Sequence, residues 1–275
     1  MSTRDAITLT GKPSRLSVAL RDLKDTARNW RLWFFLGWGD VRKQYRRSFL
    51  GPIWITLSLC IFISAYGAVG SMVFGIEIAT YIPYLTLGHV VFSLMNFLII
   101  DSCQAYITSE QLLKQLPVPK LVPVLRVQVR NWIIFLHHLL IPCLVLLIFD
   151  VSVSSQALFS LFGLVIAAIW SLGAGTLLAI VCARFRDVPL VIVNLMQVLF
   201  FVTPVLWVDA SLSGSARLLV DLNPIAAILK TVRDPLLGSV PDFGVWAYAI
   251  GCAFGALLIG LVAFVTFRKR IVYWL

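Results

Sequence analysis

The sequence predicts an all-α integral membrane protein with six transmembrane helices, and two observations support this prediction. The first is a set of six long uncharged stretches, each able to supply the roughly 20 apolar helical residues that cross a bilayer. They cover residues 48–76, 78–100, 131–149, 151–183, 188–208 and 243–267. The second is the composition: 60% of the residues are hydrophobic and only 13% are charged, which lies outside the range of soluble domains.

The positions of the basic residues predict the orientation of the chain in the membrane. Twenty of the 23 Lys and Arg residues lie in the first 47 residues, in the second and fourth gaps between the stretches, and in the C-terminal tail. Under the positive-inside rule, both termini and these two gaps are cytoplasmic. The net charge of +10 is therefore mainly an orientation signal, and we expect no nucleic-acid partner because no soluble basic module is visible.

The segment 1–47 predicts a cytoplasmic part with an amphipathic helix at the membrane interface. Its apolar residues recur every third or fourth position from Leu16 to Tyr45, which is helical periodicity. Trp and Tyr suit headgroup depth, and Lys and Arg attract anionic lipids. The arginines expected to meet lipid head groups are Arg28, Arg31, Arg42, Arg46 and Arg47. We expect Gly37 and Gly39 to interrupt this helix, and an anchor that packs beneath the bundle is the alternative.

Small residues mark the fourth and sixth stretches as packing helices. Gly163, Ala167, Ser171 and Gly175 follow one another at intervals of four, and Gly251 and Gly255 share that spacing. Such spacing lets membrane helices approach closely and gain van der Waals contact.

Polar and aromatic residues share faces on the second, third and fifth stretches, and aromatic residues mark the first. Polar side chains are costly in lipid, so these faces should point into the protein or a wet cavity. A sugar chain suits such a surface, because its hydroxyl groups need hydrogen-bond partners and the apolar faces of its rings can pack on aromatic side chains. Hydrogen bonding between helices is the alternative for each residue. The candidate channel residues are Trp54, Phe62, Tyr66, His89, Ser93, Asn96, Asn131, Phe135, His138, Asn194, Gln197 and Phe201.

The segment 209–242 is the longest gap on the outer side. It holds two apolar pieces, 216–220 and 225–232, with Asn223 and Pro224 between them. Neither piece is long enough to cross a bilayer, so we predict a re-entrant helical hairpin between the fifth and sixth helices. A surface loop is the alternative.

The sequence contains no recognisable catalytic motif. It has no GxxxxGK[ST] phosphate loop, HExxH, GxSxG or GxGxxG, and its five cysteines show no metal-ligand spacing. We therefore expect no cofactor and no metal in this chain, and any nucleotide hydrolysis must occur on another chain. Two other classes of protein stay open. A polyprenyl-phosphate sugar transferase needs a cluster of acids or His at one membrane face, and the acids here are scattered. A secondary carrier needs buried ionisable residues, and Asp101 is the single acid inside a predicted span.

Several motifs resemble those of the ABC-2 type permeases that export bacterial polysaccharides. Residues 42–54 read R-K-Q-Y-R-R-S-F-L-G-P-I-W, a basic stretch followed by S-x-L-G-P-x-W at the start of the first helix. The further matches, in order, are Leu112-Leu113-Lys114 with Pro117, Arg130-Asn131 with Phe135 and His138, residues 183–188 (A-R-F-R-D-V), and Asn223-Pro224. The resemblance covers about residues 20–275. It is strongest to permeases for lipid-linked O-antigen, with capsule and wall teichoic acid exporters next.

This resemblance implies a complex in the bacterial inner membrane. Two copies of the permease form a channel for a lipid-linked glycan, and two nucleotide-binding ATPase subunits carry ATP and Mg. Residues 48–275 would form the ABC-2 type transmembrane domain. The resemblance further implies that seven residues couple the permease to the ATPase: Glu110, Leu113, Lys114, Arg184, Phe185, Arg186 and Asp187.

Overall fold

The computed structural model describes residues 15–46, 53–208 and 214–275, and every regular element within these ranges is a helix. Five segments are long and apolar enough to cross a membrane: 57–74, 78–104, 122–148, 155–184 and 243–267. The all-helical, multi-pass membrane character predicted from the sequence is thus confirmed.

The elements are α1 (Arg15–Arg28), α2 (Trp30–Tyr45), α3 (Ile53–Phe74), α4 (Ile78–Gln104), α5 (Glu110–Gln115), α6 (Val122–His138), α7 (Leu140–Ile148), η1 (Ser155–Leu158), α8 (Phe159–Arg184), α9 (Val188–Val202), α10 (Ser215–Asp221), α11 (Pro224–Leu236), α12 (Phe243–Phe267) and α13 (Ile271–Trp274).

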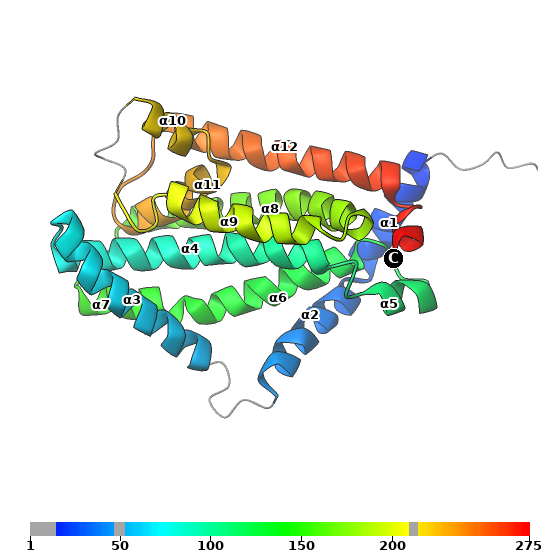
Figure 1. Cartoon of the computed structure of the whole chain (residues 1–275), viewed down its shortest axis with the longest axis horizontal. Helices are drawn as coiled ribbons and strands as arrows, with labels where there is room; N and C mark the ends of the chain where they lie inside the picture. The colour runs from blue at the N-terminus through cyan, green and yellow to red at the C-terminus, as the bar shows by residue number, and fades with distance from the viewer. Residues whose placement is uncertain (1–14, 47–52, 209–213) are drawn as a thin grey trace, which may run out of the picture.

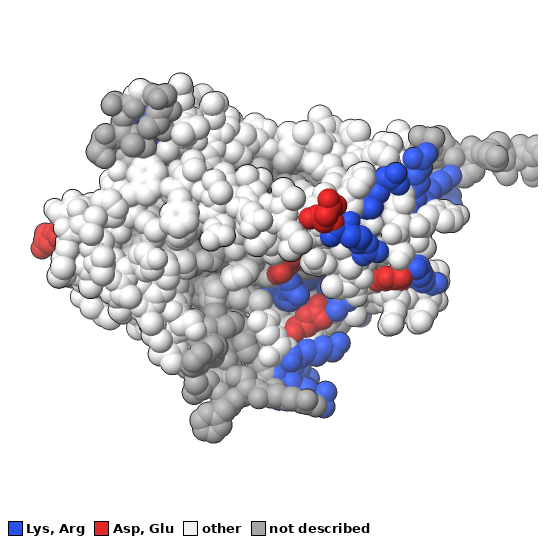
Figure 2. All heavy atoms as spheres, viewed as in Figure 1, with Lys and Arg blue, Asp and Glu red and all other residues white. Residues whose placement is uncertain are grey.

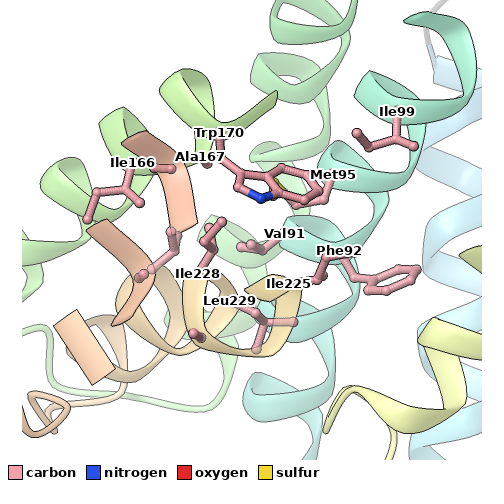
Figure 3. Close-up of a cluster of buried hydrophobic side chains, with 14 of the residues drawn as sticks. Val91, Phe92, Met95, Ile99, Ile166, Ala167, Trp170, Ile225, Ile228 and Leu229 are labelled. Carbon is pink, nitrogen blue, oxygen red and sulfur yellow. The ribbon is translucent and has the colours of Figure 1, made fainter. Parts of the chain in front are cut away.

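The long helices form a bundle around α4. Helices α4, α6, α8, α9 and α12 run along the length of the molecule, while α2 and α3 diverge from it below (Figure 1). Helix α4 packs against α3, α6, α8, α9 and α11, and α12 lies along α8. The main hydrophobic cluster fills the space between α4, α8 and α11, with Met95, Ala167 and Ile228 fully buried at its centre (Figure 3).

Two glycines hold α8 and α12 together. A Cβ atom on Gly260 would lie 2.3 Å from the carbonyl oxygen of Gly173, and a Cβ on Gly173 would lie 2.3 Å from the backbone nitrogen of Leu257. The predicted small-residue stripe on α8 faces other neighbours, since Gly163 packs on Thr231 of α11 and Gly175 on Ser102 of α4. Helix α12 is a packing helix, as predicted, but within the described residues it packs on α8 through Gly260, while Gly251 and Gly255 have nothing within 4 Å.

The third membrane segment begins nine residues earlier than the sequence predicts, at Val122 rather than Asn131. Pro123 suits the first turn of a helix, where its missing N–H costs nothing. Two arginines inside this helix have carboxylate partners: Arg126 donates to both oxygens of Asp40 on α2, at 2.5 and 2.6 Å, and Arg130 pairs with Asp101 on α4. Paired charges are tolerated inside the bundle, so their presence does not end the helix.

The helix predicted over residues 16–45 is interrupted at Asn29 rather than at Gly37 and Gly39. Gly37 instead lets α2 approach α6, because a Cβ there would lie 2.8 Å from the carbonyl oxygen of Arg126. Helix α2 keeps an exposed aromatic face at Trp30, Phe34 and Trp38, one helical turn apart. The placement of this helix at a membrane interface stays a prediction, as does the division of the chain at residue 47.

The fifth predicted stretch, 188–208, is helical only over the 15 residues Val188–Val202. After Val202 the chain turns, and side chains from α4 and α11 donate hydrogen bonds to the backbone carbonyl oxygens of this turn. Arg233 donates to the Pro204 oxygen at 2.6 Å, and Tyr81 donates to the Leu206 oxygen at 2.5 Å. At about 1.5 Å per residue, α9 is shorter than the roughly 30 Å hydrocarbon core. The count of six spans therefore stays a prediction.

The outer segment contains two helices, α10 and α11, close to the two pieces expected there. Asn223 separates them: its side chain accepts a hydrogen bond from the backbone of Ile225 and so caps α11, and it donates to Thr203 at 2.9 Å. Helix α11 packs deeply against α4, α8 and α12. Whether the pair enters the membrane as a hairpin stays a prediction.

One end of the bundle gathers charge. Helices α1, α5 and α13 and the C-terminus all lie there (Figure 1), and the Lys and Arg side chains visible in Figure 2 concentrate at the same end. We call it the basic end. Its position in the cytoplasm, with both termini, stays a prediction from the positive-inside rule.

Candidate functional site

The seven residues expected to meet an ATPase lie on elements that meet at the basic end. Glu110, Leu113 and Lys114 belong to α5, and residues 184–187 form the turn between α8 and α9. Helix α13 packs against both α5 and α8. We call these seven residues the end cluster. Leu113 is buried beneath α5, whereas Lys114 and all four residues of the turn are exposed, so the cluster offers a charged surface on an apolar base.

Opposite charges organise the end cluster. Lys114 donates to Glu110 at 2.6 Å, one helical turn away on α5. This hydrogen bond, with the positive charge of Lys114, holds the pKa of Glu110 below its ordinary value, and the positive charge of Arg186 adds to the shift. Glu110 therefore carries a full negative charge at neutral pH.

The C-terminal helix is part of the same surface. The guanidinium carbon of Arg184 lies 5.3 Å from the ring centre of Phe185 and 5.3 Å from that of Trp274, both within the range of cation–π attraction. Arg186 donates to the backbone oxygen of Trp274 at 3.5 Å. Trp274 thus connects the α8–α9 turn to the end of the chain.

A buried polar group ties three other elements at the basic end. Asp22 of α1 accepts from Arg268 at 2.7 Å and from the backbone nitrogen of Lys120 at 2.9 Å. Burial lowers the pKa of the Lys120 ammonium, and the negative charge of Asp22 opposes that shift. Burial raises the pKa of the nearby Tyr106 hydroxyl, and Asp22 raises it further.

A basic cavity of about 750 Å³ lies between α2 and α6. Arg42, Lys43 and Arg46 contribute its positive charge, and Trp38 and His137 contribute ring surfaces. Arg42 and Arg46 are exposed, as are Arg28 and Arg31 nearer the start of the segment. Arg47, also expected at the lipid headgroups, lies outside the described residues.

A second cavity, of about 350 Å³, lies between α4 and α6. Its lining includes the Asp101–Arg130 pair, Asn131 and His138. Asn131 donates to the Phe97 oxygen at 3.3 Å, while the Nε2 atom of His138 is buried without a hydrogen-bond partner in the described part of the chain. Phe135, from the same predicted face, is buried in a hydrophobic cluster with Leu59 and Ile63 rather than lining this cavity.

Rings from α3, α4 and α9 form an aromatic stack. Phe62 stacks on Tyr66 with ring centres 4.4 Å apart and on His89 at 4.1 Å, and His89 meets Phe200 edge-on at 6.0 Å. The structure therefore brings His89 of the second predicted helix onto Phe62 and Tyr66 of the first. Ser93 and Asn96 are half-buried further along α4, and the backbone of Trp54 lies in α3, with its side chain outside the described residues.

The polar residues of α9 lie on an open surface. Asn194, Gln197 and Phe201 are all exposed in the single chain. In contrast, the polar residues of α6 expected to share a channel with them, Asn131 and His138, are buried. The candidate channel residues are therefore divided between the interior of the bundle and its outer face.

Comparison with known proteins identifies relatives along most of the chain. No protein-family model matches it. Two curated proteins from Klebsiella pneumoniae, both described as O-antigen export system permease protein RfbA, are each 21% identical to it. One alignment covers 84% of this chain and 90% of the relative, and the other covers 74% and 79%. The chain resembles O-antigen export permeases. The resemblance inferred from the sequence motifs is thus confirmed.

Sequence reasoning missed several residues that organise this permease-like fold. Asp22 and Asp40 hold arginines across helices, and Arg233, only 1% exposed, lies over the Tyr84 ring at 3.9 Å. One signal was available: an acid within a strongly basic segment, or a base within an apolar one, requires a partner of opposite charge. The identity of each partner was not readable from the spacing.

Within residues 15–46, 53–208 and 214–275, no group of three or more His, Cys, Asp or Glu residues is arranged to hold a metal ion. The two cavities offer basic groups, ring faces and amide groups for binding.

Proposed function

We propose that this chain is the membrane subunit of an ABC exporter that moves a lipid-linked polysaccharide outward across the bacterial inner membrane. The favoured substrate is O-antigen, with capsular polysaccharide or teichoic acid as the alternative within the same class. The observation that carries the proposal is the similarity to O-antigen export permeases over most of a chain with five membrane-length helices. ATP hydrolysis belongs to two separate subunits, and this chain works without its own ATPase site.

The basic cavity is the loading site for the anionic head of the substrate. Arg42, Lys43 and Arg46 offer donors for a lipid-linked phosphate group, and charge-assisted hydrogen bonds to phosphate are among the strongest in proteins. Trp38 and the exposed aromatic face of α2 would hold the helix at headgroup depth. The membrane interface supplies the substrate to this cavity from the side.

The channel forms between two copies of the chain. Asn194 and Gln197 are exposed on α9, and lipid would leave their amide groups without hydrogen-bond partners, at a cost of several kcal/mol each. A second copy or a water-filled path would supply those partners. The exposed ring of Tyr66 gives the same path a stacking surface for sugars. The Nδ1 atom of His89, which has no hydrogen-bond partner among the described residues, gives it a hydrogen-bonding position.

The end cluster is the contact with the ATPase subunits. Apart from Leu113 it is exposed or half-buried, and it carries both signs of charge. Leu113 shares a buried hydrophobic cluster with Ala183 of α8 and Phe264 of α12. Movement of an ATPase pair against α5 and the 184–187 turn would therefore act directly on two membrane helices. Leu113, buried beneath α5, joins this surface to the bundle.

Co-expression tests the proposal. Cells that carry this chain together with its glycan-synthesis enzymes and a P-loop ATPase subunit should export the glycan, and ATP hydrolysis should copurify with the permease only when that subunit is present. Deleting the ATPase gene should leave the lipid-linked glycan on the cytoplasmic face. Export that continues in cells without any such subunit would overturn the proposal.

A further inference from the structure

A small apolar pocket of about 300 Å³ lies at the basic end, where α8 and α12 finish. Its walls are apolar and aromatic, and two arginines complete its lining. The walls are Ile180 and Val181 of α8, Phe185 of the following turn, Phe267 of α12 and Trp274 of α13, and the arginines are Arg184 and Arg270. The volume is at the lower limit of small-ligand sites, which suits part of one hydrocarbon chain. The cavity proposed above for loading lies elsewhere, between α2 and α6.

In the membrane orientation predicted from the sequence, this pocket lies at the depth of lipid head groups. Helices α8 and α12 are both long enough to cross a membrane, Arg184 is the last residue of α8, and Phe267 is the last of α12. The final turn of a membrane helix reaches the interface, where aromatic and basic side chains are enriched. An apolar pocket there is open to acyl chains from the neighbouring leaflet.

The two arginines at this pocket have no carboxylate partner in the part of the chain that the structure describes. Three other arginines, which point into the bundle, each have a carboxylate partner. Arg126 pairs with Asp40, Arg130 with Asp101 and Arg268 with Asp22. Arg184 instead lies against the rings of Phe185 and Trp274, and its guanidinium N–H groups have no hydrogen-bond partner among the described residues. Arg270 is exposed on the turn before α13.

We propose that this pocket binds an anionic phospholipid, with part of one acyl chain between α8 and α12 and the phosphate at Arg184 and Arg270. A basic pocket between membrane helices on the cytoplasmic side suits such lipids, because the arginines attract the negative head group while the apolar walls exclude water from the chain. The proposal concerns a resident lipid and does not depend on the exported substrate or on the ATPase. The bound lipid would brace α13 against α8 at the edge of the end cluster, to which Arg184 and Phe185 also belong.

Native mass spectrometry of the full-length chain in detergent tests this proposal. Titration with phosphatidylglycerol should give a bound adduct at lower concentration than titration with phosphatidylcholine. The double variant R184Q/R270Q should weaken phosphatidylglycerol binding about fivefold for each arginine removed. V181F should also weaken binding, because the larger ring fills the pocket without changing its charge. K269Q is the matched control, since Lys269 is exposed beside Arg270 but does not line the pocket, and it should bind as the unmodified chain does.

Two results would overturn the proposal. One is equal binding of the two lipids, or an equal loss in K269Q and R184Q/R270Q, which would indicate only general attraction to a basic surface. The other is unchanged phosphatidylglycerol binding in both V181F and R184Q/R270Q, combined with loss of a copurifying protein, which would make the pocket a protein contact. Because the titration uses the permease chain alone, its outcome is independent of whether export requires an ATPase.

Discussion

Asp22 on α1 accepts a hydrogen bond from Arg268, which lies 246 residues later in the chain, at 2.7 Å. Asp22 is 4% exposed, and it also accepts from the backbone of Lys120. One carboxylate thus connects the N-terminal helix, the end of α12 and the segment before α6. This carboxylate therefore ties α1 to the ends of two membrane-length segments, 122–148 and 243–267.

Replacing Asp22 with Asn should destabilise the protein, because it leaves the half-buried guanidinium of Arg268 without its counter-charge. Loss of one partner from a buried pair costs on the order of 3 kcal/mol, which corresponds to a fall in Tm of roughly 6 to 12 °C for a chain of this size. Thermal unfolding in detergent, followed by circular dichroism, measures this change. D25N, on the exposed face of the same helix, is the control. The double variant D22N/R268Q should recover part of the loss, and an unchanged Tm in D22N would refute the structural role.

Acidification should weaken the end cluster through Glu110. The folded pKa of Glu110 lies below its ordinary value of 4.5 because Lys114 stabilises the carboxylate. A depressed folded pKa contributes stability that is present above the unfolded value and is lost as the pH falls through the folded value. The pair should therefore be intact at neutral pH and should break below about pH 4.5.

Carbon-13 NMR can measure this pKa directly, since Glu77 and Glu110 are the two glutamates in the sequence. K114Q should raise the pKa of Glu110 toward 4.5, and R186Q should raise it by less. A titration curve for Glu110 that is the same in K114Q and the unmodified chain would show that the hydrogen bond is not maintained in solution.

Gly260→Ala should separate α8 from α12. The added Cβ would meet the backbone oxygen of Gly173 at 2.3 Å, and neither backbone can move alone. Overpacking of this kind costs about 1 to 3 kcal/mol, so Tm should fall by several degrees. G251A on the same helix adds a methyl group where nothing lies within 4 Å, and its Tm should be unchanged or slightly higher. Equal effects of the two substitutions would contradict the described packing.

Arg186→Glu should uncouple ATP hydrolysis from export. Arg186 is exposed in the end cluster and does not itself line the pocket proposed for lipid, although it donates to the backbone oxygen of Trp274, so the substitution acts mainly on the proposed ATPase contact. Like charges facing each other across an interface cost several kcal/mol, enough to reduce export more than tenfold. Glycan on the cell surface and ATPase activity of the purified complex report the two quantities separately. K269E carries the same charge reversal at the same end, and it should retain export; an equal loss in both variants would indicate an effect on membrane insertion instead.

The elements that follow from hydrophobic length and charge were predictable from the sequence. The apolar stretches at 78–100, 151–183 and 243–267 all became membrane-length helices, and Asn223 separates the two outer helices as expected. The early start of α6 was not predictable, because Arg126 and Arg130 read as loop charges until Asp40 and Asp101 are placed beside them. The contact between Gly173 and Gly260 was missed for a similar reason: spacing identifies a small-residue face, but the crossing point of two helices depends on their register.

The end cluster was more predictable from the sequence than the candidate channel. The motifs on α5 and in the 184–187 turn are far apart in sequence, yet their elements meet at one end, as their shared charge suggested. The contribution of Trp274 was not visible, because a C-terminal aromatic residue carries no signal of its partner. The channel residues divide between buried and exposed positions because a helical face shows which residues point together but not which neighbour covers them.

Transport in proteoliposomes tests the central claim most directly. The purified chain would be reconstituted with a fluorescently labelled lipid-linked glycan, alone and together with its P-loop ATPase subunit, with and without ATP and Mg. We expect movement of the glycan across the bilayer only when both proteins and ATP are present. Equal movement by this chain alone, without ATP, would contradict the proposed function.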